Sequence, residues 1–165
     1  MDDNPATNLS IEAVTSTDFE EWCELASELW PPEDAEDRAD LRQTMADILN
    51  SERETGWLVR NAAGAAIAFM NLSLRREYVP GATQSPVAYV EGIYVRPPYQ
   101  QQGVGTALIE WAEQWAQQQG CKELASDALI ENVGSYQFHT KAGFAEVERV
   151  VCFIKPLNGD KPLGE

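Results

Sequence analysis

Hydrophobic residues recur along this chain with two spacings, one typical of short strands and one typical of helices. Alternation over residues 9–14 predicts a first strand. Residues 19–30 then carry apolar side chains three or four positions apart, which predicts a helix. We expect this helix to begin at the capping box Thr17-Asp18-Phe19-Glu20 and to end at Pro31-Pro32, because proline interrupts helical hydrogen bonding. A second helix is predicted over about 35–50.

The middle of the chain has the pattern of strands. Residues 57–60 and 65–74 flank a turn at 61–64 and predict a hairpin. Prolines and a glycine mark a loop at 76–86, which leads to a strand predicted at 87–95.

The last third of the chain predicts a long helix at about 103–119, a short strand at 124–127, a short helix at 132–141 and a final strand at 145–155. The long helix has an apolar stripe that we expect to be buried, formed by Val104, Leu108, Trp111 and Trp115. The resulting order, β-α-α-β-β-β-α-β-α-β, predicts an α/β or α+β domain with a mixed central sheet flanked by helices.

Length and composition favour one domain with a full core. The chain has 165 residues, 44% of them hydrophobic. We place the domain at 8–156, between flexible termini at 1–7 and 157–165. No apolar run is long enough to cross a membrane, the N-terminus lacks the pattern of a secretory signal, and the three cysteines lack metal-ligand spacing. We therefore expect a cytoplasmic protein with reduced thiols and no metal site.

Acidic residues strongly outnumber basic ones. The net charge is −15, and residues 12–54 contain fourteen Asp and Glu residues against three Arg. This balance argues against nucleic acid as a partner, because such binding depends on Lys and Arg contacts to phosphate. It favours a cationic partner through long-range attraction, and it equally fits an acidic surface that only keeps the protein soluble.

A glycine-rich junction joins the strand at 87–95 to the helix that follows. Gly103 and Gly105 stand at the start of this helix, where backbone N–H groups and the helix dipole favour an anion such as a pyrophosphate. An ordinary loop with glycines at a helix start has the same pattern. The strand also carries a carboxylate, Glu91, a few residues upstream. The junction therefore predicts an enzyme that binds a phosphorylated cofactor.

Two sets of motifs carry a family resemblance. Gln100-x-x-Gly103-x-Gly105, with Asn132 and Lys141-x-Gly143-Phe144 at the right distance, resembles the GCN5-related N-acetyltransferase superfamily. More specific segments are similar to the aminoglycoside 6'-N-acetyltransferases within it. These segments are Leu29-Trp30, Glu77-Tyr78-Val79-x-Gly81, Ser85-Pro86-Val87, Glu91-Gly92-Ile93-Tyr94-Val95, Ala125-Ser126-Asp127 and Gly143-Phe144-x-Glu146-x-Glu148-Arg149-Val150-Val151.

The resemblance implies that acetyl-CoA is the co-substrate. The residues that it implies for acetyl-CoA binding are Ile93, Tyr94, Val95, Gln100, Gln101, Gln102, Gly103, Val104, Gly105, Thr106, Asn132 and His139. The three glutamines replace basic residues often found in this loop, so phosphate binding depends more on N–H groups. Asn132 is also a natural helix N-cap. His139 stands where many superfamily members have a tyrosine that protonates the leaving thiolate, and a lone histidine is often structural.

The catalytic residues that the resemblance implies are Glu91 and Asp127. Glu91 is the candidate general base, directly or through a water, because the attacking amine must lose a proton. The alternative explanation is that Glu91 has no catalytic role and is a charged residue on a strand face beside an arginine. Asp127 follows the neighbouring short strand and is expected to bind the substrate and to share the base role; its alternative is a turn aspartate.

The resemblance also implies a site for a cationic acceptor, built from Trp30, Tyr78, Glu91, Asp127, Glu148 and, less directly, Glu146. Trp30 and Tyr78 suit an aromatic platform for a sugar and its amines, while Trp30 equally suits a helix-end core position. Glu146 and Glu148 alternate along a predicted strand and need no function there.

The expected reaction is direct transfer of acetyl from acetyl-CoA to the 6'-amine of an aminoglycoside, which would confer resistance. One alternative is an acetyltransferase for a polyamine, another small amine or a peptide N-terminus. Another is a non-catalytic acetyl-CoA sensor. The resemblance further implies a homodimer with the C-terminal strand near its interface. The negative charge and the lack of a long apolar run predict no association with nucleic acid or membrane.

Overall fold

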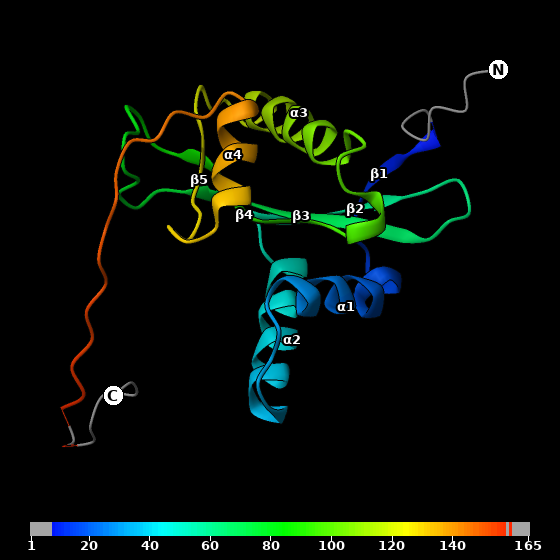
Figure 1. Ribbon diagram of the computed structural model, residues 1–165, viewed down its shortest axis with the longest axis horizontal. Coiled ribbons are helices and arrows are strands. Elements are labelled where there is room, and N and C mark those ends of the chain that lie inside the picture. The colour runs from blue at the N-terminus through cyan, green and yellow to red at the C-terminus, as the bar shows by residue number, and fades with distance from the viewer. Residues whose placement is uncertain (1–7, 158, 160–165) are drawn as a thin grey trace.

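A computed structural model describes residues 8–157 and 159, so the predicted termini lie largely outside the described residues. A five-stranded sheet lies between α1 and α2 on one face and α3 and α4 on the other (Figure 1). The strands are β1 (Ser10–Ala13), β2 (Glu54–Arg60), β3 (Ala66–Arg75), β4 (Val87–Val95) and β5 (Leu124–Ser126). The α-helices are α1 (Phe19–Leu29), α2 (Ala35–Leu49), α3 (Val104–Gln118) and α4 (Val133–Lys141). Short 3-10 turns cover Ser16–Asp18 and Pro97–Tyr99.

The sheet follows chain order, β1-β2-β3-β4-β5, and this confirms the predicted mixed sheet flanked by helices. β1 to β4 pair antiparallel, whereas β4 and β5 pair parallel. The parallel ladder is short and ends where Val90 faces Ser126. The rest of β4, from Glu91 to Val95, is therefore unpaired on that side within the described sheet, and it leaves a strand edge open beside β5.

Each face of the sheet has its own hydrophobic core. On the α3 side, Leu108, Ile109 and Ala112 are buried against the sheet. The two tryptophans of the predicted stripe, Trp111 and Trp115, are only half-buried, since the smaller side chains Ala112 and Ala116 let the helix backbone approach the sheet closely. The stripe prediction was therefore right for Val104 and Leu108 and wrong for full burial of the tryptophans.

On the opposite face, Trp22 fixes α1 to the sheet. Its side chain is 0% exposed, and its indole N–H donates to the Asn71 side-chain oxygen at 3.0 Å. A Cβ at Gly56 would overlap the indole ring, so glycine at this position of β2 makes room for it. The buried indole donor is thus paired, as a buried polar group requires, and α1 is held in one position along β3.

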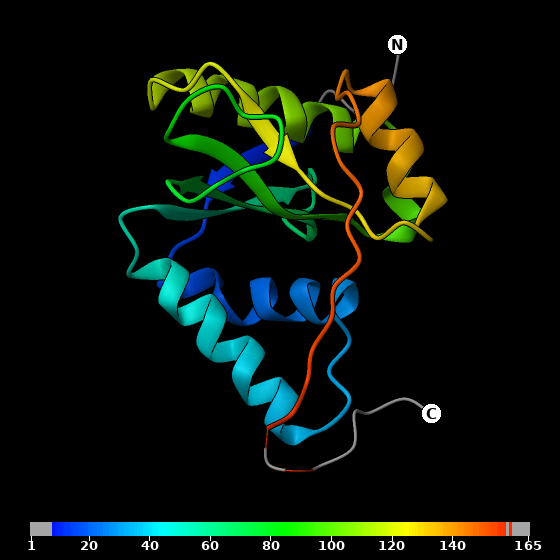
Figure 2. The ribbon, with the colours of Figure 1, turned by 90° about the vertical axis from the view of Figure 1, so that its left-hand side faces the viewer.

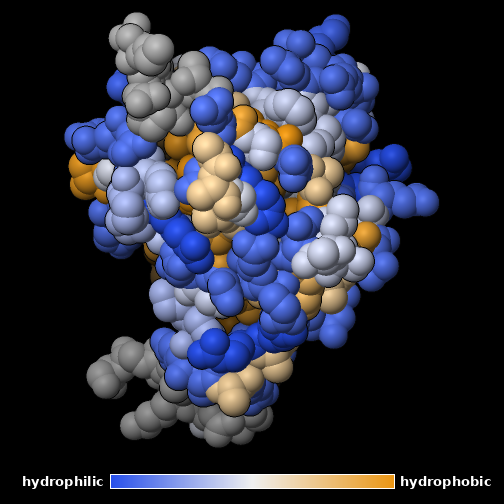
Figure 3. Space-filling view, turned by 90° about the vertical axis from the view of Figure 1, so that its right-hand side faces the viewer, coloured by the Kyte–Doolittle hydropathy of each residue, from blue (hydrophilic) through white to orange (hydrophobic). Residues whose placement is uncertain are grey.

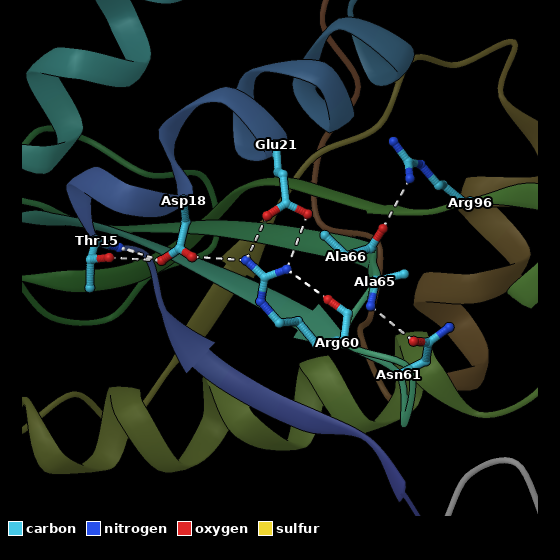
Figure 4. Close-up of polar contacts among 9 residues, drawn as sticks. Thr15, Asp18, Glu21, Arg60, Asn61, Ala65, Ala66 and Arg96 are labelled. Atoms are coloured by element: carbon cyan, nitrogen blue, oxygen red, sulfur yellow. Dashed lines mark hydrogen bonds and ion pairs between the residues drawn. The ribbon is translucent and has the colours of Figure 1, made fainter.

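A cluster of ion pairs around Arg60 joins the β2–β3 hairpin to the start of α1 (Figure 4). Arg60 pairs with Asp18 at 2.8 Å and with Glu21 at 3.0 Å.

The capping box predicted at 17–20 was wrong: the Thr15 backbone N–H and hydroxyl both donate to Asp18, at 2.9 Å. Glu20 instead pairs with Arg42 of α2. A short 3-10 turn before α1 shifts the cap by two residues.

The predicted last strand at 145–155 was wrong. Residues 145–157, here called the C-terminal arm, are extended but have no strand partner among the described residues. The arm leaves α4 and runs away from the sheet (Figures 1 and 2). Its apolar side chains are largely exposed, with Phe153 at 92% and Ile154 at 89%. Alternation predicted a strand, but a strand needs a neighbouring edge, and this fold of a single chain does not bring one to the arm.

The side of the molecule turned away from the arm is mostly hydrophilic, with small hydrophobic patches between polar residues (Figure 3). Within the described part of the chain, no helix has both the length and the apolar character needed to cross a membrane.

Candidate active site

A β-bulge in β4 places Glu91. Gly92 pairs with Asn71 and Val90 pairs with Leu72, so Glu91 is an extra residue without a partner on β3. A bulge bends the strand and redirects the side chain at that position, and such bulges are frequent beside active sites. Here it places Glu91 on the same face as Ser73 and Arg75 of β3, at the point where β4 and β5 separate.

Glu91 is held by three hydrogen bonds from β3. The Ser73 hydroxyl donates to Oε1 at 2.6 Å, Arg75 Nε donates to Oε1 at 2.7 Å, and the Arg75 NH2 group donates to Oε2 at 2.7 Å. Burial alone would raise the pKa of Glu91, but the hydrogen bonds from Arg75 and Ser73 and the Arg75 charge outweigh it and lower this pKa below its usual range. The predicted alternative, a strand-face carboxylate beside an arginine, therefore describes its surroundings.

Asp127 is held by Tyr89 of β4. The Tyr89 hydroxyl donates to Oδ2 of Asp127, and the Arg75 guanidinium lies over the Tyr89 ring, 3.4 Å from its centroid. Burial and the hydrogen bond to Asp127 raise the pKa of Tyr89, which keeps its hydroxyl a donor at neutral pH. The two predicted carboxylates, Glu91 and Asp127, thus belong to one polar group, linked through Arg75 and Tyr89.

Sequence reasoning missed Ser73, Arg75 and Tyr89. A signal was present: Ser73 and Arg75 alternate with Leu72 and Leu74 in a strand, so polar side chains line one face. Tyr89 likewise stands two residues before Glu91. Alternation assigns residues to a face, but it does not say which strand lies alongside, so these partners required the structure.

The glycine-rich loop has the geometry of an anion site. Gly103 has a φ of +84°, and a Cβ there would meet nothing within 4 Å. The Ala107 N–H donates to the Gly103 carbonyl at 3.0 Å as α3 begins, which leaves the preceding N–H groups of Val104, Gly105 and Thr106 without intrahelical partners. These groups and the helix dipole favour a phosphate at this point.

The glutamines of this loop shape its backbone. The Gln100 side-chain amide donates to the Val95 carbonyl at 2.9 Å, and that of Gln102 donates to the Pro98 carbonyl at 3.1 Å. Gln101 adopts a φ of +60°, in the left-handed region. Two of the three glutamines that the resemblance implies for acetyl-CoA binding therefore have side chains bonded within the loop, and the fit to a pyrophosphate depends on backbone N–H groups, as expected.

Gly105 has a packing role that the sequence did not predict. A Cβ at this position would lie 2.8 Å from the Phe138 ring, so glycine lets α3 and α4 approach each other. Ile93, Tyr94 and Val95 pair with β3 but have no partner on the β5 side, and they lie between this loop and Glu91. Their backbone groups on the β5 side suit an added extended chain, as at other open strand edges.

Asn132 and His139 both have partners within the chain. The Asn132 side chain caps α4 by accepting the Ser135 N–H at 3.0 Å. His139 Nδ1 lies 2.7 Å from the Ser135 carbonyl, and Nε2 lies 2.7 Å from the Ser126 hydroxyl. Because a carbonyl only accepts, Nδ1 donates to Ser135, and Nε2 shares a hydrogen bond with the Ser126 hydroxyl. Cofactor contacts of Asn132 and His139 stay predictions.

Trp30 packs against β4 at Gly92, the residue that follows Glu91. Its indole packs on β4 so closely that a Cβ at Gly92 would overlap it, and it meets Phe69 edge to face at 5.8 Å. It remains 40% exposed, so one surface is available to a ligand. A groove of about 380 Å³ adjoins it, lined by Leu29, Trp30, Pro31, Pro32, Leu41 and two carboxylates, Asp37 and Asp40.

Tyr78 and Glu148 lie on neighbouring segments. Tyr78 is 83% exposed on the loop before β4, and Val147 of the arm packs against Gly81 of the same loop. Glu148 is exposed at this start of the arm. Glu146 is bonded by Arg149 and by the Tyr136 hydroxyl, and these contacts lower its pKa. Substrate binding by Tyr78, Glu146 and Glu148 stays a prediction.

The arrangement places an anion site, an open strand edge and two carboxylates in succession. A phosphate at the start of α3 and an extended chain along Ile93–Val95 would bring the end of such a molecule to Glu91 and Asp127. The carboxylates favour a cation at that end. Among the described residues, no group of three or more His, Cys, Asp or Glu side chains is placed to hold a metal ion.

Comparison with known proteins agrees with this geometry. A family model for the acetyltransferase (GNAT) family matches residues 19–144. The aminoglycoside N(6')-acetyltransferase type 1 of Serratia marcescens is 44% identical over 136 residues, which cover 82% of this chain and 91% of that protein. The protein of the same name from Acinetobacter haemolyticus is 38% identical over 150 residues, covering 91% and 100% of the two chains.

Solved structures of aminoglycoside 6'-N-acetyltransferases are also similar to this chain. AAC(6')-Iy in complex with the bisubstrate analog CoA-S-monomethyl-acetylneamine has a TM-score of 0.82 and 34% identity, covering 91% of this chain and 99% of that chain. The aminoglycoside 6'-N-acetyltransferase AAC(6')-Ih from Acinetobacter baumannii also has a TM-score of 0.82, with 36% identity over 90% and 99% of the two chains.

Proposed function

Because this chain belongs to the GNAT family of acetyltransferases, we propose that it transfers acetyl from acetyl-CoA to the 6'-amine of aminoglycosides. The observation that carries the acceptor assignment is the pair of carboxylates, Glu91 and Asp127, at the point where β4 and β5 separate. Acetylation removes a positive charge from the antibiotic and so weakens its binding to RNA phosphates. The biological consequence is resistance.

The residues of this chain position both reactants. The N–H groups at the start of α3 hold the pyrophosphate of acetyl-CoA, and the backbone of Ile93–Val95 holds its extended arm. The amine nitrogen attacks the thioester carbonyl, the C–N bond forms, the C–S bond breaks, and CoA leaves as the thiolate. A thiol with an ordinary pKa near 8.5 leaves readily, so positioning supplies much of the rate.

A cationic acceptor suits the surface around Trp30. Trp30 presents an aromatic face beside Glu91, and the adjoining groove carries Asp37 and Asp40. Aromatic faces and carboxylates both attract ammonium groups, and several such groups on one rigid sugar would engage several of them. The net charge of −15 attracts the same molecules over a longer range.

The test is thiol release from acetyl-CoA with separate acceptors: kanamycin, tobramycin, spermidine and a short peptide. We expect rapid turnover with the two aminoglycosides only. An aminoglycoside with a hydroxyl in place of the 6'-amine is the matched control and should not react. Turnover confined to spermidine or the peptide would reject the aminoglycoside assignment, and acetyl-CoA binding without turnover would favour the sensor alternative.

We also propose that the chain forms a homodimer through the C-terminal arm. Five apolar side chains of the arm are between 70% and 94% exposed: Val150, Val151, Phe153, Ile154 and Leu157. Such a continuous apolar segment is unfavourable in water, and its extended backbone also presents unpaired donors and acceptors. A second copy of the chain would cover both.

Replacing Phe153 with aspartate tests this assembly. We expect the wild-type chain to sediment as a dimer and Phe153→Asp to shift it toward the 18.3 kDa monomer, because a charge would enter the covered surface. Leu129→Asp is the control, since Leu129 is 77% exposed but lies outside the arm. A wild-type chain that is monomeric at tens of micromolar in analytical ultracentrifugation would refute the dimer.

A further inference from the structure

Arg75 contacts both Glu91 and Tyr89, the residue that holds Asp127. Its guanidinium forms a bidentate pair with Glu91, with both N···O distances at 2.7 Å. The same guanidinium lies 3.4 Å from the centroid of the Tyr89 ring, and the Tyr89 hydroxyl donates to Asp127. One cation on β3 therefore fixes Glu91 directly and Asp127 through Tyr89.

The two carboxylates differ in how many of their oxygens are occupied. Both oxygens of Glu91 accept hydrogen bonds, and its side chain is 31% exposed. Asp127 is exposed, and within the described chain Tyr89 bonds only its Oδ2. A bidentate arginine stabilises the ionised form of its partner, so Glu91 holds its charge but accepts a proton poorly. Asp127 has an oxygen available for an incoming N–H group.

We propose that Arg75 is a positioning residue that fixes Glu91 as a permanent anion for the acceptor ammonium and, through Tyr89, aims Asp127 to take its proton. This inference rests on the proposed function. One ammonium proton passes to Asp127, and the freed electron pair attacks the thioester carbonyl. As the C–N bond forms and the C–S bond breaks, the nitrogen loses a second proton, which neutralises the departing CoA thiolate to the free thiol, and Asp127 releases its own proton to water. The assignment replaces the expectation that Glu91 is the base.

The charges that face Glu91 determine how its ionisation depends on pH. Arg75 comes from β3, Tyr89 from β4 and Asp127 from the end of β5. Hydrogen bonds from backbone N–H groups are the main cause that lowers the pKa of the nearby Glu77 carboxylate, and the charge of Arg75 adds to them. Only Arg75 in this group is cationic. Without Arg75, only the Ser73 hydrogen bond would oppose the effect of burial, so the pKa of Glu91 would rise.

The test compares Arg75→Gln with Arg42→Gln. Arg42 is a matched control, since it also forms a bidentate pair, with Glu20, and lies over an aromatic ring, that of Phe19, but on α2. We would measure kcat and KM for kanamycin and for acetyl-CoA at pH 6, 7 and 8, always as a ratio to wild type. The melting temperature of each variant separates stability from catalysis.

We expect Arg75→Gln to lower kcat/KM for kanamycin by about tenfold or more at pH 7. The loss should be larger at pH 6 than at pH 8, because a rise in the pKa of Glu91 favours its protonated form more at the lower pH. KM for acetyl-CoA should change less than about twofold, since Arg75 faces Val87, at the opposite end of β4 from Val95 and the α3 loop. Arg75→Lys should recover the loss specific to pH 6 by restoring the charge, but not full kcat, because lysine cannot form the bidentate pair.

Tyr89→Phe keeps the ring under Arg75 and removes only the hydroxyl, so it serves if Arg75→Gln folds poorly. It should lower kcat with little change in KM for kanamycin. The inference is overturned if Arg75→Gln loses the same factor at every pH as Arg42→Gln does, or if both Arg75→Lys and Tyr89→Phe match wild type. A wild-type chain that does not acetylate kanamycin would instead refute the proposed function.

Discussion

Replacing Asp127 with asparagine is expected to lower kcat by about 100-fold or more. The amide has nearly the same shape and its oxygen still accepts the Tyr89 hydroxyl, so the local geometry remains. It cannot take a proton from the acceptor, and a positioned general base contributes roughly 10²- to 10⁴-fold to a rate. Steady-state kinetics with kanamycin would measure the loss, with KM for acetyl-CoA changed less than about twofold.

Glu123→Gln is the control for Asp127→Asn. Glu123 precedes β5, whereas Asp127 follows it, so the substitution removes the same charge from the other end of the strand. Its carboxylate bonds Thr83, on the surface. We expect kcat within about twofold of wild type, since general electrostatic attraction is weak compared with a direct proton transfer. An Asp127→Asn enzyme within threefold of wild type would remove Asp127 from the proton-transfer step.

Replacing Gly103 with valine is expected to raise KM for acetyl-CoA by about tenfold or more. The side chain would stand beside the free N–H groups at the start of α3, in space that a pyrophosphate would otherwise enter. The residue also has a φ of +84°, which is strained for a β-branched side chain by about 1–2 kcal/mol. Binding of CoA by calorimetry would measure the loss directly.

Gly64→Val separates strain from blocked binding. Gly64, in the turn between β2 and β3, has a φ of +83°, and a Cβ there would likewise meet nothing within 4 Å. Valine should lower the melting temperature by a similar amount at both positions, but Gly64→Val should leave CoA affinity unchanged. Equal CoA affinity in the two variants would show that the α3 loop does not hold the pyrophosphate.

The elements that depend on local pattern were predictable from the sequence. β4 has the predicted bounds, 87–95, because its apolar run and the flanking loop signals are local. The C-terminal arm has a comparable alternation, yet it is not a strand, because strand formation depends on a partner that sequence spacing does not provide. β4 is a strand because β3 lies alongside it, whereas the C-terminal arm, with a similar pattern, has no strand edge beside it among the described residues.

The candidate site was predictable to the same extent. Glu91, Asp127 and Gly103 were identified from motifs, and the structure brings the two carboxylates into one polar group. Arg75 and Tyr89 were not identified, since their contacts with the two carboxylates depend on which strands pair and on the bulge at Glu91. A bulge adds one residue to a strand without a clear signature, and every side-chain direction beyond it is reversed.

That bulge has an evolutionary consequence. Residue 91 stands outside the ladder between β3 and β4, so no residue directly opposite on β3 forms a cross-strand pair with its side chain. Its neighbours Val90 and Gly92 keep the sheet in register whatever residue 91 carries. Selection for a different acceptor can therefore act on the charge at this position, together with Arg75, while the scaffold that binds acetyl-CoA is inherited unchanged.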